Sequence, residues 1–154
     1  MRYWVVGIFV LCFDQLTKYW VTKGYSPRES VEIIPGMLWL TRVHNYGAAF
    51  GLFSGRVLLL ILASLVVVAA TLVHRRKILE LGPLAQWGLT LALSGALGNL
   101  VDRVFRGYVV DFIDVRFWPV FNVADAAVAV GVFLVGWQCF MVRPHRGEGS
   151  LGCD

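Results

Sequence analysis

Long apolar stretches separated by polar segments dominate the sequence. Residues 57–73, 83–101 and 126–142 contain no Asp, Glu, Lys or Arg, and a similar stretch at 3–22 is interrupted only by Asp14 and Lys18. At about 1.5 Å per helical residue, each stretch is long enough to cross roughly 30 Å of hydrocarbon. The pattern therefore predicts an α-helical integral membrane protein with four transmembrane helices.

We expect these helices at about residues 3–22, 57–74, 83–105 and 121–142, within one membrane-embedded domain at 1–146. The tail at 147–154 contains three glycines and no periodicity, so we expect it to be disordered. A cleaved secretory signal is an alternative interpretation of the first stretch. No small-x-small cleavage site follows it, and we therefore expect it to be retained as a helix.

Between the first and second helices, the sequence predicts two short β-strands. Residues 31–34 and 37–43 flank the dipeptide Pro35-Gly36, which is typical of a tight turn. Small and aromatic residues follow at 45–53, where we expect backbone packed at the membrane surface. The segment at 106–120 is interpreted as a loop whose aromatic rings lie at headgroup level.

Composition agrees with a membrane protein and limits the partners. Hydrophobic residues make up 58% of the chain and charged residues 16%, with a mean hydropathy of +0.68. The net charge is +4, but basic residues placed near helix ends suit anionic lipid headgroups better than nucleic acid. Three cysteines without CxxC spacing and three scattered histidines indicate neither a disulfide framework nor a metal site. We expect no nucleic-acid partner, no metal and no cofactor.

The distribution of basic residues gives an expected orientation. The densest cluster, Arg75-Arg76-Lys77, lies between the second and third helices, and further arginines lie near both termini. By the positive-inside rule, both termini then face the cytoplasm. The two loops on the opposite side contain as many basic residues as the cytoplasmic side, so charge supports this orientation only moderately.

Polar groups follow one face of the third helix near its outer end. The face consists of Gly95, Gly98, Asn99, Asp102, Arg103 and Arg106, which recur at steps of three and four residues. Packing would explain the small residues, and Asp102 could pair with Arg103 or Arg106. Because one helix rarely needs so many costly groups merely to pack, we favour a functional role.

Two further pairs of polar residues have both structural and functional interpretations. Asp14 and Lys18 are spaced i, i+4 in the order that favours contact, which allows mutual neutralisation or a functional role. Asn122 is expected to cap the fourth helix, with Asp125 in the first turn. This capping is expected whether or not Asp125 also reacts.

Asp111 and Asp114 both precede the fourth helix, and their spacing does not distinguish between them. Either could converge with Asp125, because consecutive elements joined by short loops are usually neighbours. Two carboxylates in a partly desolvated pocket share one proton. The ionised member can activate water to attack an amide while the protonated member hydrogen-bonds the carbonyl oxygen.

Two other functions remain as alternatives at this point. A small proton-coupled transporter would use membrane carboxylates, but it would distribute them across the depth of the bilayer. An assembly subunit would explain the glycines but not the converging Asn and Asp residues. Since the polar groups gather toward one side and no GxSxG, HExxH or Asp-Thr-Gly motif is present, a metal-free hydrolase is favoured.

Five sequence blocks, within roughly residues 14–132, carry a family resemblance. They are DQLTK at 14–18, NYGAAFG at 45–51, GNLVDR at 98–103, GYVVDF at 107–112 and FNVAD at 121–125. In this order they resemble lipoprotein signal peptidase, the type II signal peptidase of bacteria. The resemblance implies an aspartic endopeptidase that cleaves diacylglyceryl-modified prolipoproteins just before the lipidated cysteine.

The resemblance also implies roles for individual residues. Asp111 and Asp125 would form the catalytic dyad, whereas Asp114 lies outside the catalytic position. The supporting or substrate-binding groups would be Asp14, Asn45, Asn99, Arg103 and Asn122. For Lys18 and Asp102, which also lie in the motifs, a structural role explains their presence at least as well.

The setting that the resemblance implies is the bacterial inner membrane. The strands at 31–43 would form an extracytoplasmic β-strand cradle, with the active site near the periplasmic face. The expected partners are diacylglyceryl-modified prolipoproteins and membrane lipids, and we expect a monomer.

Overall fold

The four predicted helices are present in the computed structural model, which describes residues 2–47 and 55–141. They are α1 (Arg2–Gly24), α2 (Val57–Glu80), α3 (Pro83–Arg106) and α4 (Val123–Met141). Each is long and apolar enough to cross a membrane. Helix α2 continues beyond the predicted residue 74, and α4 begins later than predicted. The expected disordered tail, and the part of the 45–53 segment from residue 48 onward, lie outside the described residues.

The helices expose large apolar side chains that a water-soluble protein of this size would bury. Ile8 on α1 is 62% exposed, Val66 on α2 is 67% exposed, and Phe133 on α4 is 64% exposed. Such extended apolar surface marks contact with a membrane or a partner. The chain therefore has the fold of a helical membrane protein, as predicted.

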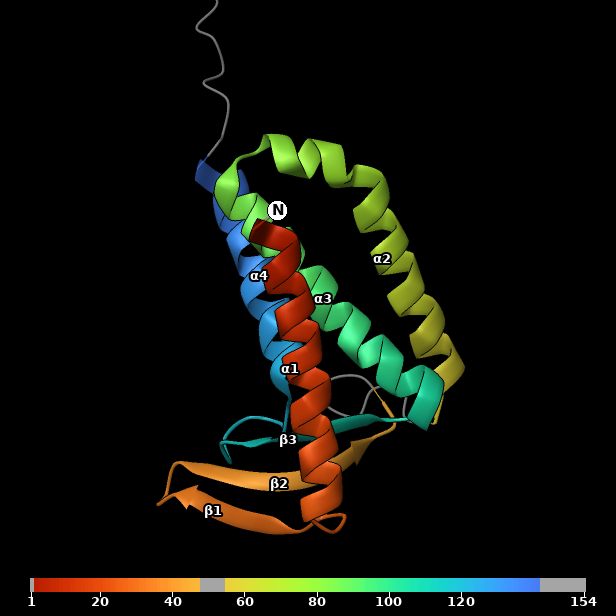
Figure 1. Cartoon of the computed structure of the whole chain (residues 1–154), viewed down its shortest axis with the longest axis vertical. Coiled ribbons are helices and arrows are strands. Elements are labelled where there is room, and N and C mark those ends of the chain that lie inside the picture. Colours follow the sequence, from red (N-terminus) through yellow and green to blue (C-terminus); the bar gives the residue numbers. More distant parts are fainter. Residues whose placement is uncertain (1, 48–54, 142–154) are drawn as a thin grey trace, which may run out of the picture.

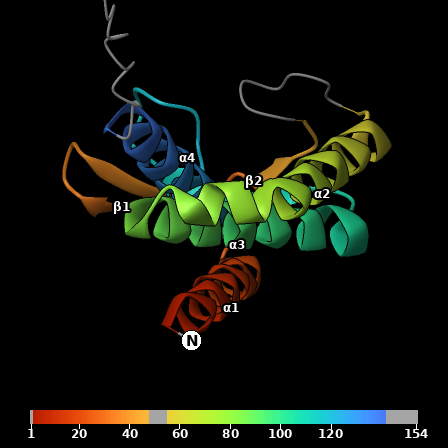
Figure 2. The ribbon, with the colours of Figure 1, turned by 90° about the horizontal axis from the view of Figure 1, so that it is seen from above.

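Helix α3 lies at the centre of the bundle and contacts each of the other three helices (Figures 1 and 2). Its contact with α4 depends on glycine. A Cβ atom added to Gly131 would lie 2.5 Å from both the backbone nitrogen of Ala92 and the backbone oxygen of Gly88. This close approach holds α3 against α4, the two helices that carry Asn99, Arg103 and Asp125.

A three-stranded antiparallel sheet lies at one end of the bundle (Figure 1). The strands are β1 (Ser30–Ile34), β2 (Leu38–Asn45) and β3 (Val109–Asp114), in the order β1-β2-β3. The first two strands and the turn between them confirm the prediction. Gly36, directly after Pro35, has a φ of 69°, and the Met37 N–H donates to the Ile34 carbonyl at 3.0 Å, as in a type II turn.

The interpretation of residues 106–120 as a loop was wrong for β3. Two aspartates within six residues lower the strand propensity of this segment. Pairing with a distant strand supplies what the local sequence lacks, since Val43 of β2 lies opposite Asp111 and Asn45 lies opposite Val109. As a result, Asp111 is held on a paired strand instead of a free loop.

Candidate active site

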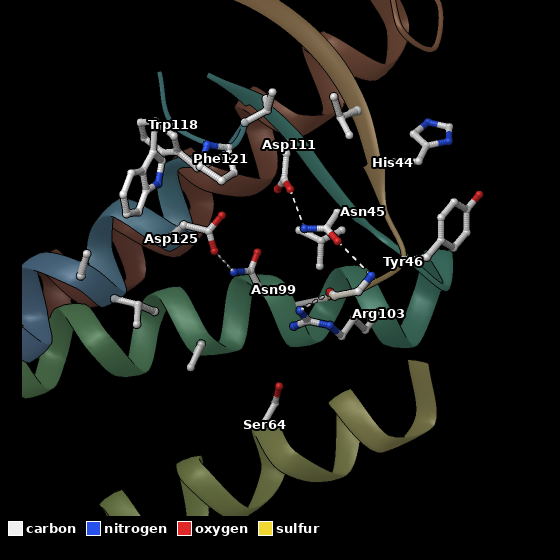
Figure 3. A pocket seen from close by; sticks show the side chains of 18 residues that line it. His44, Asn45, Tyr46, Ser64, Asn99, Arg103, Asp111, Trp118, Phe121 and Asp125 are labelled. Atoms are coloured by element: carbon white, nitrogen blue, oxygen red, sulfur yellow. Dashed lines mark hydrogen bonds between the residues drawn. The ribbon is translucent and has the colours of Figure 1, made fainter. Parts of the chain in front are cut away.

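Asp111 and Asp125 line the same cavity, which has a volume of about 740 Å³ (Figure 3). Asp111 projects from β3 and Asp125 from the first turn of α4, and the cavity also receives side chains from β2, α2 and α3. Among the carboxylates of the described residues, these are the only two that line it. The structure thus brings together a carboxylate that follows α3 and one that opens α4.

Asp111 is almost completely buried, with 2% of its surface exposed. The Asn45 side chain donates to one of its oxygens at 2.8 Å, and the Asn122 side chain donates to the other at 2.6 Å. Burial and the nearby Asp125 carboxylate raise the pKa of Asp111 to about 7, although the two amide hydrogen bonds act in the opposite direction. This carboxyl group can therefore hold or release a proton near neutral pH.

Asp125 is fixed by a reciprocal cap at the start of α4. The Asp125 N–H donates to Asn122 Oδ1 at 2.9 Å, and the Asn122 N–H donates to Asp125 Oδ2 at 3.3 Å. The predicted capping role of Asn122 is confirmed. The Asn122 side-chain nitrogen also donates to the Asp111 carboxylate, so Asn122 bonds both carboxylates: Asp111 through its side chain and Asp125 through its backbone N–H.

Asn99 of α3 connects Asp125 to a buried lysine. Its Nδ2 donates to Asp125 Oδ1 at 2.7 Å, while its Oδ1 accepts from Lys18 Nζ at 3.0 Å and from Asn122 Nδ2 at 3.2 Å. Two donors to the amide oxygen leave only the nitrogen free to face the carboxylate. The amide orientation of Asn99 is therefore determined by its neighbours.

Lys18 lies at the centre of a buried charge network and has no exposed surface. Its Nζ lies 2.9 Å from Asp14 Oδ2 and 3.0 Å from Asp102 Oδ2. Among the described residues, Asp102 also pairs with Arg106 and not with Arg103, the other partner that the sequence allowed. The predicted contact between Asp14 and Lys18 is confirmed.

Asp14 supports α4 and does not line the cavity. Its Oδ1 accepts from the backbone N–H of Ala124 in the first turn of α4, at 2.9 Å. The neighbouring Gln15 donates to Asp14 at 3.1 Å and to the Gly98 carbonyl at 3.1 Å. The sequence interpretation did not single out Gln15, although its place beside Asp14 in the first block was a signal.

Arg103 of α3 lines the cavity, and one of its N–H groups has no acceptor among the described residues. Its Nη2 donates to the Gly47 carbonyl at 3.5 Å, but its buried Nε has no hydrogen-bond partner among the described residues. Asn45 lies close by, and its Oδ1 accepts from the Gly47 N–H at 2.9 Å. The site thus contains a cationic donor beside the two aspartates.

Asp114 lies on the same strand as Asp111 but outside the cavity. It accepts from Thr41 Oγ1 at 2.8 Å and from the Arg116 N–H at 2.9 Å. These contacts hold the outer end of the sheet together. The structure therefore separates the two carboxylates that spacing could not distinguish.

Several cavity residues were not identified as site residues from the sequence. They are His44, Tyr46, Ser64, Trp118 and Phe121. The aromatic residues at 117–118 indicated a membrane interface but not a position beside the dyad. His44 stacks on Tyr108 with ring centroids 4.1 Å apart, and burial and Arg42 lower the pKa of His44.

The chain is similar to known proteins over most of its length. The family described as signal peptidase (SPase) II matches residues 6–141. The lipoprotein signal peptidase of Moorella thermoacetica is 41% identical over 148 residues, which covers 96% of this chain and 99% of that protein. That of Syntrophomonas wolfei is 43% identical over 135 residues, covering 88% and 90%. A solved structure of a bacterial membrane enzyme is 31% identical, with a TM-score of 0.86, and covers 98% of this chain and 94% of that chain.

Proposed function

Because this chain belongs to the signal peptidase II family, we propose that it is an aspartic endopeptidase that removes the signal peptide from diacylglyceryl-modified prolipoproteins. Cleavage would occur just before the lipidated cysteine. The observation that carries the proposal is the pair formed by Asp111 and Asp125. Both line one cavity, and asparagine side chains hold each of them in place.

The pair would act with one shared proton. The ionised carboxylate takes a proton from water as the water oxygen bonds to the amide carbon, and the protonated carboxyl hydrogen-bonds the carbonyl oxygen. In the second step the carbon–nitrogen bond breaks, and a carboxyl group donates a proton to the leaving nitrogen. The signal peptide leaves with a new carboxyl terminus, and the cysteine gains a free amino group.

Arg103 and the apolar cavity wall would bind the substrate. The guanidinium group of Arg103, which lines the cavity, can donate to a backbone carbonyl of an extended peptide. Ala96, Val128 and Ala129 form an apolar part of the same cavity, on helices that also face the bilayer. A substrate anchored by acyl chains can therefore reach the dyad laterally without leaving the membrane.

We further propose that the sheet and the dyad lie at the periplasmic face, with both termini in the cytoplasm. A prolipoprotein presents its modified cysteine at that face, so the dyad must meet it there. The chain, a bacterial membrane protein, is expected to act as a monomer, because one copy contains both aspartates and their amide partners.

Cleavage of a defined substrate tests this function. The purified protein should convert a diacylglyceryl-modified prolipoprotein to a smaller product whose first residue is the modified cysteine, as shown by gel mobility and mass spectrometry. The same prolipoprotein without diacylglyceryl is the control and should be cleaved far more slowly. Equal cleavage of the two forms would argue against lipid recognition, and the absence of cleavage would argue against the peptidase itself.

The pH dependence should report the shared proton. Because the pKa of Asp111 is raised to about 7, we expect kcat/KM to fall as the pH rises through this region and the last proton leaves the pair. The Asn45 amide stabilises the ionised form of Asp111, so Asn45→Ala should raise that pKa and move the alkaline limb upward by roughly one pH unit.

A pH-rate profile of Tyr46→Phe provides the control for this prediction. Tyr46 is the next residue in the chain and also lines the cavity, but it donates no hydrogen bond to Asp111 among the described residues. The alkaline limb of the Tyr46→Phe profile should match that of the wild type. An unchanged or lowered limb in Asn45→Ala would contradict the assignment of this limb to Asp111.

A further inference from the structure

A second cavity, of about 460 Å³, lies between α1 and α2 at the end of the bundle away from the sheet. We call it the α1–α2 groove, and its wall includes Ile8, Leu11, Leu72, Arg75, Leu93 and Ser94. Helix α3 forms its floor, because α1 and α2 each pack on α3 (Figure 1). The groove belongs to the helical part of the molecule and shares no lining residue with the candidate active site.

The interior of the groove suits a hydrocarbon chain. Three polar side chains on its α3 wall are already bonded to helix carbonyls: Ser94 donates to the Thr90 carbonyl at 2.8 Å, Thr90 to the Gln86 carbonyl at 2.9 Å, and Gln86 to the Leu79 carbonyl at 3.2 Å. The rest of the wall is almost entirely aliphatic or aromatic. A polar ligand placed against this wall would lose its hydration and gain few hydrogen bonds in return, whereas an acyl chain has no such cost.

One edge of the groove carries concentrated positive charge. Arg75 lines the groove, and Arg76 and Lys77 follow it on the last turns of α2, where all three are exposed. None of them forms an ion pair with a carboxylate among the described residues. This edge is therefore complementary to an anion located at the level of the helix ends.

We propose that the α1–α2 groove binds an anionic glycerophospholipid, with one acyl chain between α1 and α2 and the phosphate at Arg75, while Arg76 and Lys77 add positive charge at the same helix end. The apolar wall of the groove suits the acyl chain of such a lipid, and the exposed basic residues suit its phosphate. The bound chain would brace α2, whose main helical contact among the described elements is with α3. The proposal does not depend on the peptidase activity.

Photocrosslinking of the whole protein tests the site. The protein is reconstituted in phosphatidylcholine nanodiscs that contain a trace of phosphatidylglycerol with a diazirine on one acyl chain, and the adducts are mapped by mass spectrometry. We expect adducts to concentrate on groove segments of α1, α2 and α3. Unlabelled phosphatidylglycerol should compete roughly tenfold more effectively than added phosphatidylcholine.

Matched variants separate the headgroup site from the acyl site. The triple variant R75Q/R76Q/K77Q should abolish the preference for phosphatidylglycerol, whereas Arg56→Gln at the other end of α2 should keep it. Leu72→Trp should reduce adducts within the groove, whereas the neighbouring Val73→Trp, whose side chain lies outside the groove, should not. The headgroup variants change only exposed residues, so they remain informative if Leu72→Trp folds poorly.

Three results would overturn the proposal. They are equal competition by phosphatidylcholine, a preference that survives the triple variant, and adducts spread evenly over all four helices. Each would indicate ordinary annular lipid in place of a specific site. Peptidase activity is measured separately, so a failure of the lipid site is distinguishable from a failure of the proposed function.

Discussion

Asp111→Asn and Asp125→Asn are each expected to abolish prolipoprotein cleavage, lowering kcat by on the order of 10³-fold or more. An amide can neither take a proton from water nor donate the shared proton in the way a carboxyl group does. Asparagine has nearly the same shape, so both variants should fold and still bind substrate. Single-turnover cleavage of the diacylglyceryl-modified prolipoprotein measures the chemical step directly.

Asp114→Asn is the matched control for the dyad. Asp114 lies on the same strand as Asp111 and is also buried, but its partners are Thr41 and Arg116, and it does not line the cavity. We expect this variant to retain most of the wild-type activity. Full activity in either dyad variant, or complete loss in Asp114→Asn, would contradict the proposed roles.

Lys18→Met is expected to have the second largest effect, on both stability and turnover. It leaves Asp14 without its cationic partner and removes one of the two cations paired with Asp102. Breaking a buried pair in this way destabilises a protein by roughly 3–5 kcal/mol. Thermal unfolding in detergent should show a clearly lower midpoint.

The same substitution should disturb the dyad through Asn99. Without Lys18, one donor to Asn99 Oδ1 is lost, and the amide can turn its oxygen toward Asp125. We therefore expect kcat to fall more than KM rises, because the substitution displaces a group that orients Asp125 and touches no substrate. Lys18 is in this sense a positioning residue.

Lys23→Met provides the control, because this lysine is on the same helix but exposed and makes no ion pair among the described residues. The double variant Lys18→Met/Asp14→Asn removes both charges and should regain part of the lost stability. The amide oxygen introduced by Asp14→Asn could still accept from the Ala124 N–H. Wild-type stability in Lys18→Met would show that the buried network contributes little.

This network explains how a residue distant from the cavity can matter for the site. Asp14 on α1 bonds the first turn of α4, Lys18 reaches α3, and Asn99 on α3 bonds Asp125. The polar residues of three helices thus form one connected structure behind the dyad. Each member is satisfied by the others, as buried polar groups in a membrane require.

Local patterns were sufficient for the membrane topology and for several contacts near the site. An uncharged stretch long enough to cross the bilayer has few alternatives to a helix, because every backbone polar group must be satisfied within the segment. The Pro35-Gly36 turn, the Asn122 cap and the contact of Asp14 with Lys18 are also short-range features. Their partners lie within four residues, so spacing alone specifies them.

Other features depend on contacts between segments far apart in the chain, and only the tertiary structure decided them. Strand β3 exists because β2 pairs with it, and this pairing brings Asp111 into the cavity while Asp114 bonds Thr41 outside it. The family resemblance had favoured Asp111 over Asp114, whereas their spacing in the sequence did not distinguish them. The links from α1 to α4 likewise arise only when the helices pack, since the residues involved are separated by up to 110 positions.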